Sequence, residues 1–138
     1  MIVVGAIGVK SACLLLTYVL GLKVFEVVEY YAEDGTCPFV AWYESLDRHA
    51  ALKVRIALAL IERGNLGDVK TVGAGVSERK IDFGPGYRVY FGKDGDKLII
   101  LLGGGTKKRQ SGDIAKAQTS WADYKRQKRQ RNKDNGTN

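Results

Sequence analysis

Four short apolar runs between residues 69 and 102 constrain the fold of this chain most strongly. They cover residues 69–73, 76–83, 87–92 and 97–102, and the turns between them read Gly-Ala-Gly, Gly-Pro-Gly and Asp-Gly-Asp. Short apolar-rich runs joined by glycine turns are typical of consecutive antiparallel strands. The second half of the sequence therefore predicts a β-meander.

The segment before the meander predicts one strand and two helices. Residues 23–32 are rich in Val, Phe and Tyr and fit a strand, whereas Asp34-Gly35 marks a turn. A short helix follows, and Asp47 can cap a second helix over residues 49–63. Helical spacing predicts two buried faces, made of Phe39, Trp42, Tyr43 and Leu46 in the first helix and of Leu52, Ile56, Ala59 and Leu60 in the second.

The end of the chain predicts a last helix and a charged tail. The helix is expected over about residues 112–125, and residues 125–138 contain no apolar side chain and are expected to be disordered. The predicted order is β-α-α-β-β-β-β-α, an α+β domain over residues 23–124 with helices packed against one curved sheet. The inner side of the last helix is predicted to carry Ile114, Ala117, Trp121 and Tyr124.

The first 22 residues differ in kind from the rest, because they are almost wholly apolar apart from Lys10, Ser11 and Thr17. A secretory signal would need a basic start and a small-residue cleavage site, and neither is clear. A membrane anchor needs about 20 apolar residues, and Lys10 lies near the middle of the run. The third interpretation, which we favour, is an extension outside the folded domain.

The positive charge is concentrated at the C-terminal end. The chain has 138 residues and a net charge of +7; residues 1–106 hold 12 basic and 12 acidic residues, and residues 107–138 hold 10 basic and 3 acidic ones. A neutral body with a basic end favours an anionic partner, most simply nucleic acid, and a solubilising tail is the alternative.

Few catalytic classes are compatible with this sequence. Two cysteines, Cys13 and Cys37, and one histidine, His49, are too few for a four-ligand zinc site or a two-histidine metal centre. The sequence contains no P-loop and no nucleophile elbow. Strand alternation gives a sharper signal, because it places Lys80, Arg88 and Tyr90 on the face opposite the apolar residues of their strands.

We expect that face to be open and concave, with Lys107, Lys108 and Arg109 at its rim. Cations beside an aromatic ring suit a phosphodiester backbone with a stacked base, and an ordinary charged outer face is the alternative.

Several longer strings resemble a known family. Residues 64–70 read Gly-Asn-Leu-Gly-Asp-Val-Lys, and residues 82–91 read Asp-Phe-Gly-Pro-Gly-Tyr-Arg-Val-Tyr-Phe. With Asp-Gly-x-x-Pro-Phe-x-x-Trp at 34–42 and Leu-Leu-x-Gly-Gly-x-Lys at 101–107, they resemble the addiction module killer proteins, a HigB-type branch of the RelE/HigB/ParE toxins. The resemblance covers about residues 23–124. It implies a RelE-like fold, in which a curved, mostly antiparallel sheet packs on an N-terminal helical hairpin and ends in a C-terminal helix.

The resemblance also implies a function. It points to a cytoplasmic toxin of a type II toxin–antitoxin pair that cleaves mRNA, often on the ribosome, by attack of the ribose 2′-OH on phosphate without metal or cofactor. The implied partners are mRNA, the ribosome and an antitoxin of the HigA type with a helix-turn-helix; no membrane attachment is expected. Arg88 matches the family's arginine on this strand, Lys80 a basic position on the preceding strand, and Lys107 the basic loop after the last strand. We expect these three residues to be catalytic, and we expect Tyr90, Arg79, Lys108 and Arg109 to contact the RNA.

The sequence departs from the family pattern at Arg79-Lys80, where relatives usually have Leu-Arg. Arg79 falls on the predicted apolar face, so either its side chain reaches an edge or the strand contains a bulge. Three other functions stay open at this point: a gyrase-inhibiting toxin of the ParE type, an RNA-binding domain without catalysis, and an inactive relic of a mobile element.

Overall fold

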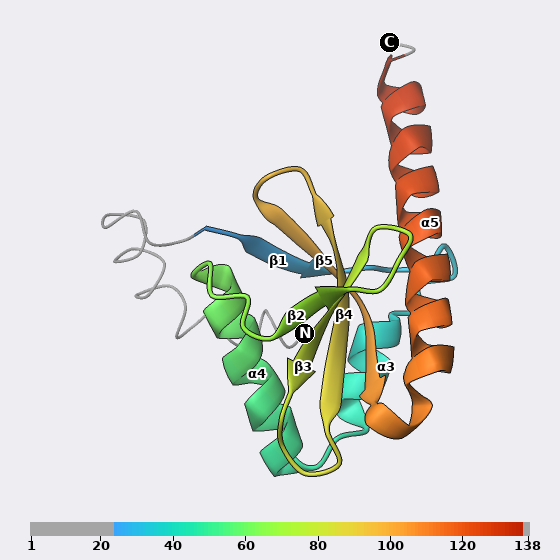
Figure 1. The fold of residues 1–138 in the computed structure, drawn as a ribbon. Coiled ribbons are helices and arrows are strands. Elements are labelled where there is room, and N and C mark those ends of the chain that lie inside the picture. Colours follow the sequence, from blue (N-terminus) through green and yellow to red (C-terminus); the bar gives the residue numbers. More distant parts are fainter. Residues whose placement is uncertain (1–23, 137–138) are drawn as a thin grey trace.

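The protein, seen here as a computed structural model that describes residues 24–136, is a five-stranded sheet with helices on both faces (Figure 1). The strands are β1 (Glu26–Glu29), β2 (Val69–Thr71), β3 (Val76–Ile81), β4 (Tyr87–Asp94) and β5 (Leu98–Thr106). The helices are α3 (Pro38–Glu44), α4 (Arg48–Glu62), the single turn η1 (Lys107–Arg109) and α5 (Gln110–Gly136). The predicted α+β class and the predicted order of elements are confirmed.

The sheet is mixed, with the strand order β1-β5-β4-β3-β2. β1 runs parallel to β5, and the four strands from β2 to β5 form the predicted antiparallel meander. The turns between them need backbone that glycine adopts readily, since Gly84, Gly86 and Gly95 all have positive φ. β5 is longer than predicted, because it continues through the three glycines at 103–105.

One face of the sheet, called here the α4 face, packs on α3 and α4. Its core contains Val89 and Phe91 of β4 together with Phe39, and the predicted inner residues of α3 also belong to it. The predicted buried stripe of α4 is wrong: Leu52 and Ile56 are 52% and 47% exposed. Apolar residues surround almost the whole helix, so the spacing fits two faces equally well. The side chains that pack inward are Ala50, Val54, Ala57, Leu58 and Ile61.

The opposite face, called here the α5 face, is covered by α5, which lies across the sheet from α4 (Figure 1). The expectation of an open concave face is therefore wrong. α5 packs there because its predicted inner side is apolar, and Trp121 of that side lies over Gly92 of β4. This second core is smaller than the first; its buried members are Tyr30, Val76, Tyr90, Ile100, Leu102, Ala117 and Trp121.

The helix α5 extends well past residue 125, so the prediction of a disordered basic tail is wrong for residues 125–136. The extension projects beyond the sheet (Figure 1). Two ion pairs anchor its beginning: Arg126 contacts Glu33 at 2.5 Å, and Lys128 contacts Asp94 at 2.6 Å. Lys, Arg and Gln are also good helix formers, so the segment continues the helix without apolar contacts.

The apolar extension predicted over residues 1–22 lies outside the described residues. Within residues 24–136, no helix combines the length and the apolar character needed to cross a membrane.

Candidate functional site

A group of polar side chains lies buried on the α5 face of the sheet. Buried charged side chains are unusual on a sheet face that packs against a helix. Glu78 of β3 pairs with Tyr90 of β4, and Lys80 pairs with Arg88, so that the side chains of all four project to the same side. Glu78, Arg88 and Tyr90 are 2%, 5% and 0% exposed, whereas Lys80 is exposed. Alternation along the strands thus brings a buried acid, a buried cation and a buried phenol together.

Arg88 is incompletely satisfied in this environment. Its Nε lies 3.6 Å from Glu78 Oε1, an ion-pair distance that is too long for a hydrogen bond. Within residues 24–136, Arg88 Nε and Nη1 have no hydrogen-bond partner. Buried donors without an acceptor are costly, by about 1–3 kcal/mol each. The guanidinium is therefore suited to bind an additional acceptor group.

The beginning of α5 supplies two further polar groups. Gln110 Nε2 donates a hydrogen bond of 2.8 Å to Glu78 Oε2. The carboxylate of Asp113 lies directly against Gly105, which is the β5 residue opposite Arg88. A side chain at position 105 would collide with Asp113, so glycine is required there for this approach. We call Glu78, Arg88, Tyr90, Gln110 and Asp113 the Arg88 cluster.

The Tyr90 hydroxyl is held neutral by its surroundings. Burial is the main cause that raises the pKa of Tyr90, and the negative charges of Glu78 and Asp113 add to it. A neutral phenol can donate a hydrogen bond to an anion. The Tyr90 hydroxyl lies beside the Glu78 carboxylate, whose hydrogen-bond interaction with it also raises the pKa of Tyr90. Tyr90 is therefore a neutral donor beside Arg88 whose hydroxyl also faces Glu78.

Exposed cations lie at the end of the sheet next to Arg88. Gly86 lies next to both Arg88 and Lys107: the position that a Cβ atom would take on Gly86 is 3.4 Å from Arg88 Nη1 and 3.8 Å from Lys107 Cβ. The guanidinium therefore reaches toward the start of η1. The backbone N–H of Lys107 also donates to the Gly86 carbonyl at 3.1 Å. Lys107, Lys108 and Arg109 are all exposed in this turn. Lys107 is thus placed close to Arg88.

Arg79 lies apart from this group. β3 and β4 pair without a bulge at this position, and Arg79 pairs with Val89, whose side chain belongs to the α4 face. The Arg79 guanidinium donates to the backbone carbonyl of Leu66, in the loop after α4. Of the two alternatives for this residue, the side chain that reaches an edge is therefore the one observed.

The sequence prediction missed three members of the Arg88 cluster as site residues: Glu78, Gln110 and Asp113. Alternation did place Glu78 on the same face as Lys80, but nothing in the strand pattern showed that this face is buried. Gln110 and Asp113 lie in the first turn of a helix whose position over the α5 face could not be read from local sequence.

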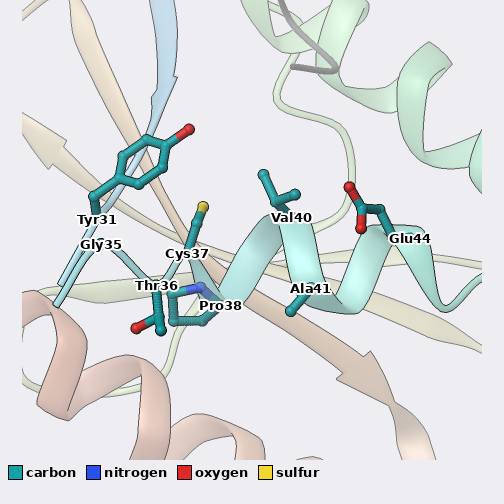
Figure 2. A pocket seen from close by; sticks show the side chains of 8 residues that line it. All are labelled: Tyr31, Gly35, Thr36, Cys37, Pro38, Val40, Ala41 and Glu44. Carbon is teal, nitrogen blue, oxygen red and sulfur yellow. The ribbon is translucent and has the colours of Figure 1, made fainter.

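A separate hollow of about 800 Å³ lies beside α3, between the end of β1 and the helix (Figure 2). Tyr31, Cys37 and Glu44 are among its lining residues, and it contains no member of the Arg88 cluster. Burial raises the pKa of the Cys37 thiol, which keeps this sulfur protonated and poorly nucleophilic. Glu44 is the one charged side chain among these lining residues, and none of them is a cation that could bind phosphate.

Comparison with known proteins places the chain among relatives but gives no activity. No protein-family model matches the chain. It is 40% identical over 83 residues to an uncharacterized protein of Haemophilus influenzae, and the aligned stretch spans 59% of this chain and 84% of that protein. The chain belongs to the family of that protein. That relative is uncharacterized, so the comparison carries no activity over to this chain. Within residues 24–136, no group of three His, Cys, Asp or Glu side chains is arranged to hold a metal ion.

Proposed function

We propose that the chain is an RNA-cleaving toxin of a type II toxin–antitoxin pair, and that Arg88 binds the phosphate to be cleaved. The observation that carries this proposal is the buried guanidinium with two unsatisfied donors, Nε and Nη1. Carboxylate and phosphate oxygens are the acceptors that fit such a planar donor group, and phosphate is the one that RNA supplies. Exposed Lys80 and Lys107 border the same position and would attract the RNA backbone toward it.

The cluster also contains the groups that a 2′-OH attack requires. A carboxylate takes the proton of the ribose 2′-OH, and the oxygen then forms a bond to phosphorus. We assign this role to one of two carboxylates in the cluster: Glu78, 3.6 Å from Arg88 Nε, or Asp113, which lies against the Gly105 opposite Arg88. Arg88 stabilises the additional negative charge on the phosphorane.

The bond from phosphorus to the 5′ oxygen then breaks. This oxygen receives a proton from the exposed Lys107 ammonium or from water. The products are a 2′,3′-cyclic phosphate and a 5′-OH end. Glu78→Gln and Asp113→Asn tell the two carboxylates apart, because only the variant that removes the acceptor abolishes cleavage.

The fold and the partners implied by the family resemblance belong to the same proposal. We infer a RelE-like topology, which is supported by the order β-α-α-β-β-β-β-α and by the antiparallel meander that follows two helices. The partners are mRNA on the ribosome and a helix-turn-helix antitoxin encoded beside the toxin. The basic residues at the rim and along the extension of α5 favour an RNA partner.

The test is to induce the full chain in a bacterium and to sequence RNA ends that carry 5′-OH and 2′,3′-cyclic phosphate. The proposal predicts new ends inside coding sequences within minutes of induction, at least tenfold above the uninduced culture. Growth arrest with trapped gyrase–DNA complexes and no new RNA ends would instead indicate a gyrase-inhibiting toxin. No arrest and no new ends would contradict any active toxin.

A further inference from the structure

The outer face of α4 is an unusual surface for a helix that already packs on a sheet. Leu52 and Ile56 are among the few large apolar side chains that are exposed in residues 24–136, and they lie one helical turn apart. Ala59 continues the same line and is also exposed. A helix that is apolar on both sides is normally covered on both sides. The sheet covers the inner side of α4, and no described residue buries the outer one.

Three arginines flank this apolar line. Arg48, Arg55 and Arg63 recur at helical spacing with Leu52, Ile56 and Ala59, so that the six positions share one face, and all six side chains are exposed. None of the six is acidic. We call these six residues the outer face of α4. Leu52, Ile56 and Ala59 form its apolar centre. Arg48 and Arg63 place positive charge at its two ends, and Arg55 places one beside its middle.

We propose that the outer face of α4 docks an acidic amphipathic helix of a partner protein. Such a helix would place apolar side chains at a spacing of three and four residues against Leu52, Ile56 and Ala59, with Asp or Glu beside each arginine. Arginine forms bidentate contacts with carboxylates, so the pairing would set the register as well as add affinity.

Charge complementarity favours an acidic helix over two segments that the chain itself could supply, namely a second copy of α4 and residues 1–22. In an antiparallel contact between two copies, Arg55 would face its own counterpart and Arg48 would face the counterpart of Arg63, which is repulsive. Residues 1–22 contain Lys10 as their single charged side chain, so they complement the apolar centre and none of the arginines. An acidic helix complements both parts of the surface.

This surface lies on the side of the sheet opposite the Arg88 cluster, since α4 and α5 cover different faces (Figure 1). A partner bound there leaves the Arg88 cluster in place. The inference therefore goes beyond the proposed RNA cleavage and is tested without measuring it.

The test uses the full chain in the cells that naturally produce it, with photoreactive p-benzoylphenylalanine placed at position 52 and, separately, at position 56. Mass spectrometry identifies the peptide joined to each position. We expect both positions to crosslink to the same segment of another protein, rich in Asp and Glu and with helical spacing of apolar residues. Reversing Arg48→Glu and Arg55→Glu together should lower the yield at least tenfold, while Lys116→Glu with Arg129→Glu, exposed cations of α5, should change it less than twofold.

The inference fails if the crosslinked peptide is residues 1–22, a second copy of this chain, or a neutral or basic segment. It also fails if no adduct forms, or if the Arg48 and Arg55 reversals leave the yield unchanged. Both arginines are exposed, so the reversal should preserve the far-ultraviolet circular dichroism of the chain. Arg48→Gln with Arg55→Gln provides the same test with a smaller change of charge.

Discussion

The two faces of the same strands bury different kinds of side chain. On the α4 face, β4 contributes Val89 and Phe91 to an apolar core. On the α5 face, the same strand contributes Arg88 and Tyr90, which meet Glu78 of β3. Burying charged groups brings little stability and often reduces it. The α4 face therefore contributes the larger apolar core, and the α5 face carries the polar groups to which we assign phosphate binding.

The largest effect is expected from a deletion on the α4 face. Phe91 is fully buried there, and Phe91→Ala should lower the free energy of unfolding by about 3–5 kcal/mol through lost contacts and a cavity. Urea unfolding followed by circular dichroism measures this loss. A decrease below about 1 kcal/mol would mean that this core is not the main source of stability.

The matched change on the α5 face should have a different outcome. Replacing both members of the buried pair, Glu78→Leu with Arg88→Met, removes two buried charges and keeps their volume roughly constant. We expect the free energy of unfolding to change little, or to rise by about 1–4 kcal/mol, because the desolvation cost disappears. RNA cleavage should be lost completely. If the double variant instead unfolds easily while a control such as Lys116→Met does not, the pair has a structural role and the comparison fails.

Local patterns of the sequence predicted the strands. Most of the features that these patterns did not predict depend on contacts between residues far apart in the sequence. Alternation in β4 gave the correct face for Arg88 and Tyr90, and the glycine turns gave the meander. The inner side of α4 was ambiguous because residues 50–61 are apolar on both sides. The first turn of α5 buries the Arg88 cluster. Ion pairs to Glu33 and Asp94, which are distant in sequence, stabilise the extension of that helix. Neither contact can be predicted from the local spacing of residues.

A smaller effect is expected from acid on the attachment of α5. The hydrogen bond from Tyr30 is the main cause that lowers the pKa of Asp123 to about 2, with further contributions from Arg126 and Gln127. Since this value lies below the ordinary pKa of 3.8, the charged carboxylate stabilises the docked helix above about pH 4, and this contribution is lost as the pH falls toward 2. The indole nuclear magnetic resonance signal of Trp121 reports the docking.

The control for this pH dependence is Asp123→Asn, which removes the titrating group. The variant should show a smaller change of the Trp121 signal between pH 5 and pH 2, whereas the wild-type change should be centred well below 3.8. Identical curves for the two proteins would show that other carboxylates control the attachment of α5.

The smallest effect is expected on the exposed side of α4. Leu52→Ala should change the free energy of unfolding by less than about 0.5 kcal/mol, since half of its surface already contacts solvent. Ile61→Ala, on the inner side of the same helix, should lower it by about 2–5 kcal/mol. Equal losses measured by urea unfolding would contradict this orientation of α4, and a larger loss from Leu52→Ala would indicate the opposite one.

The most direct test of the central claim compares two arginines on adjacent strands. Purified Arg88→Ala and Arg79→Ala proteins are assayed with a short RNA, alone and on ribosomes, and the cyclic phosphate product is quantified. Removing Arg88 should lower the cleavage rate at least about 100-fold, equivalent to about 3 kcal/mol of transition-state stabilisation. Arg79→Ala should keep the rate within about threefold, because that guanidinium contacts the Leu66 carbonyl on the other side of the sheet. Equal rates for the two variants, or a greater loss from Arg79→Ala, would contradict the assignment of the α5 face as the site that cleaves RNA.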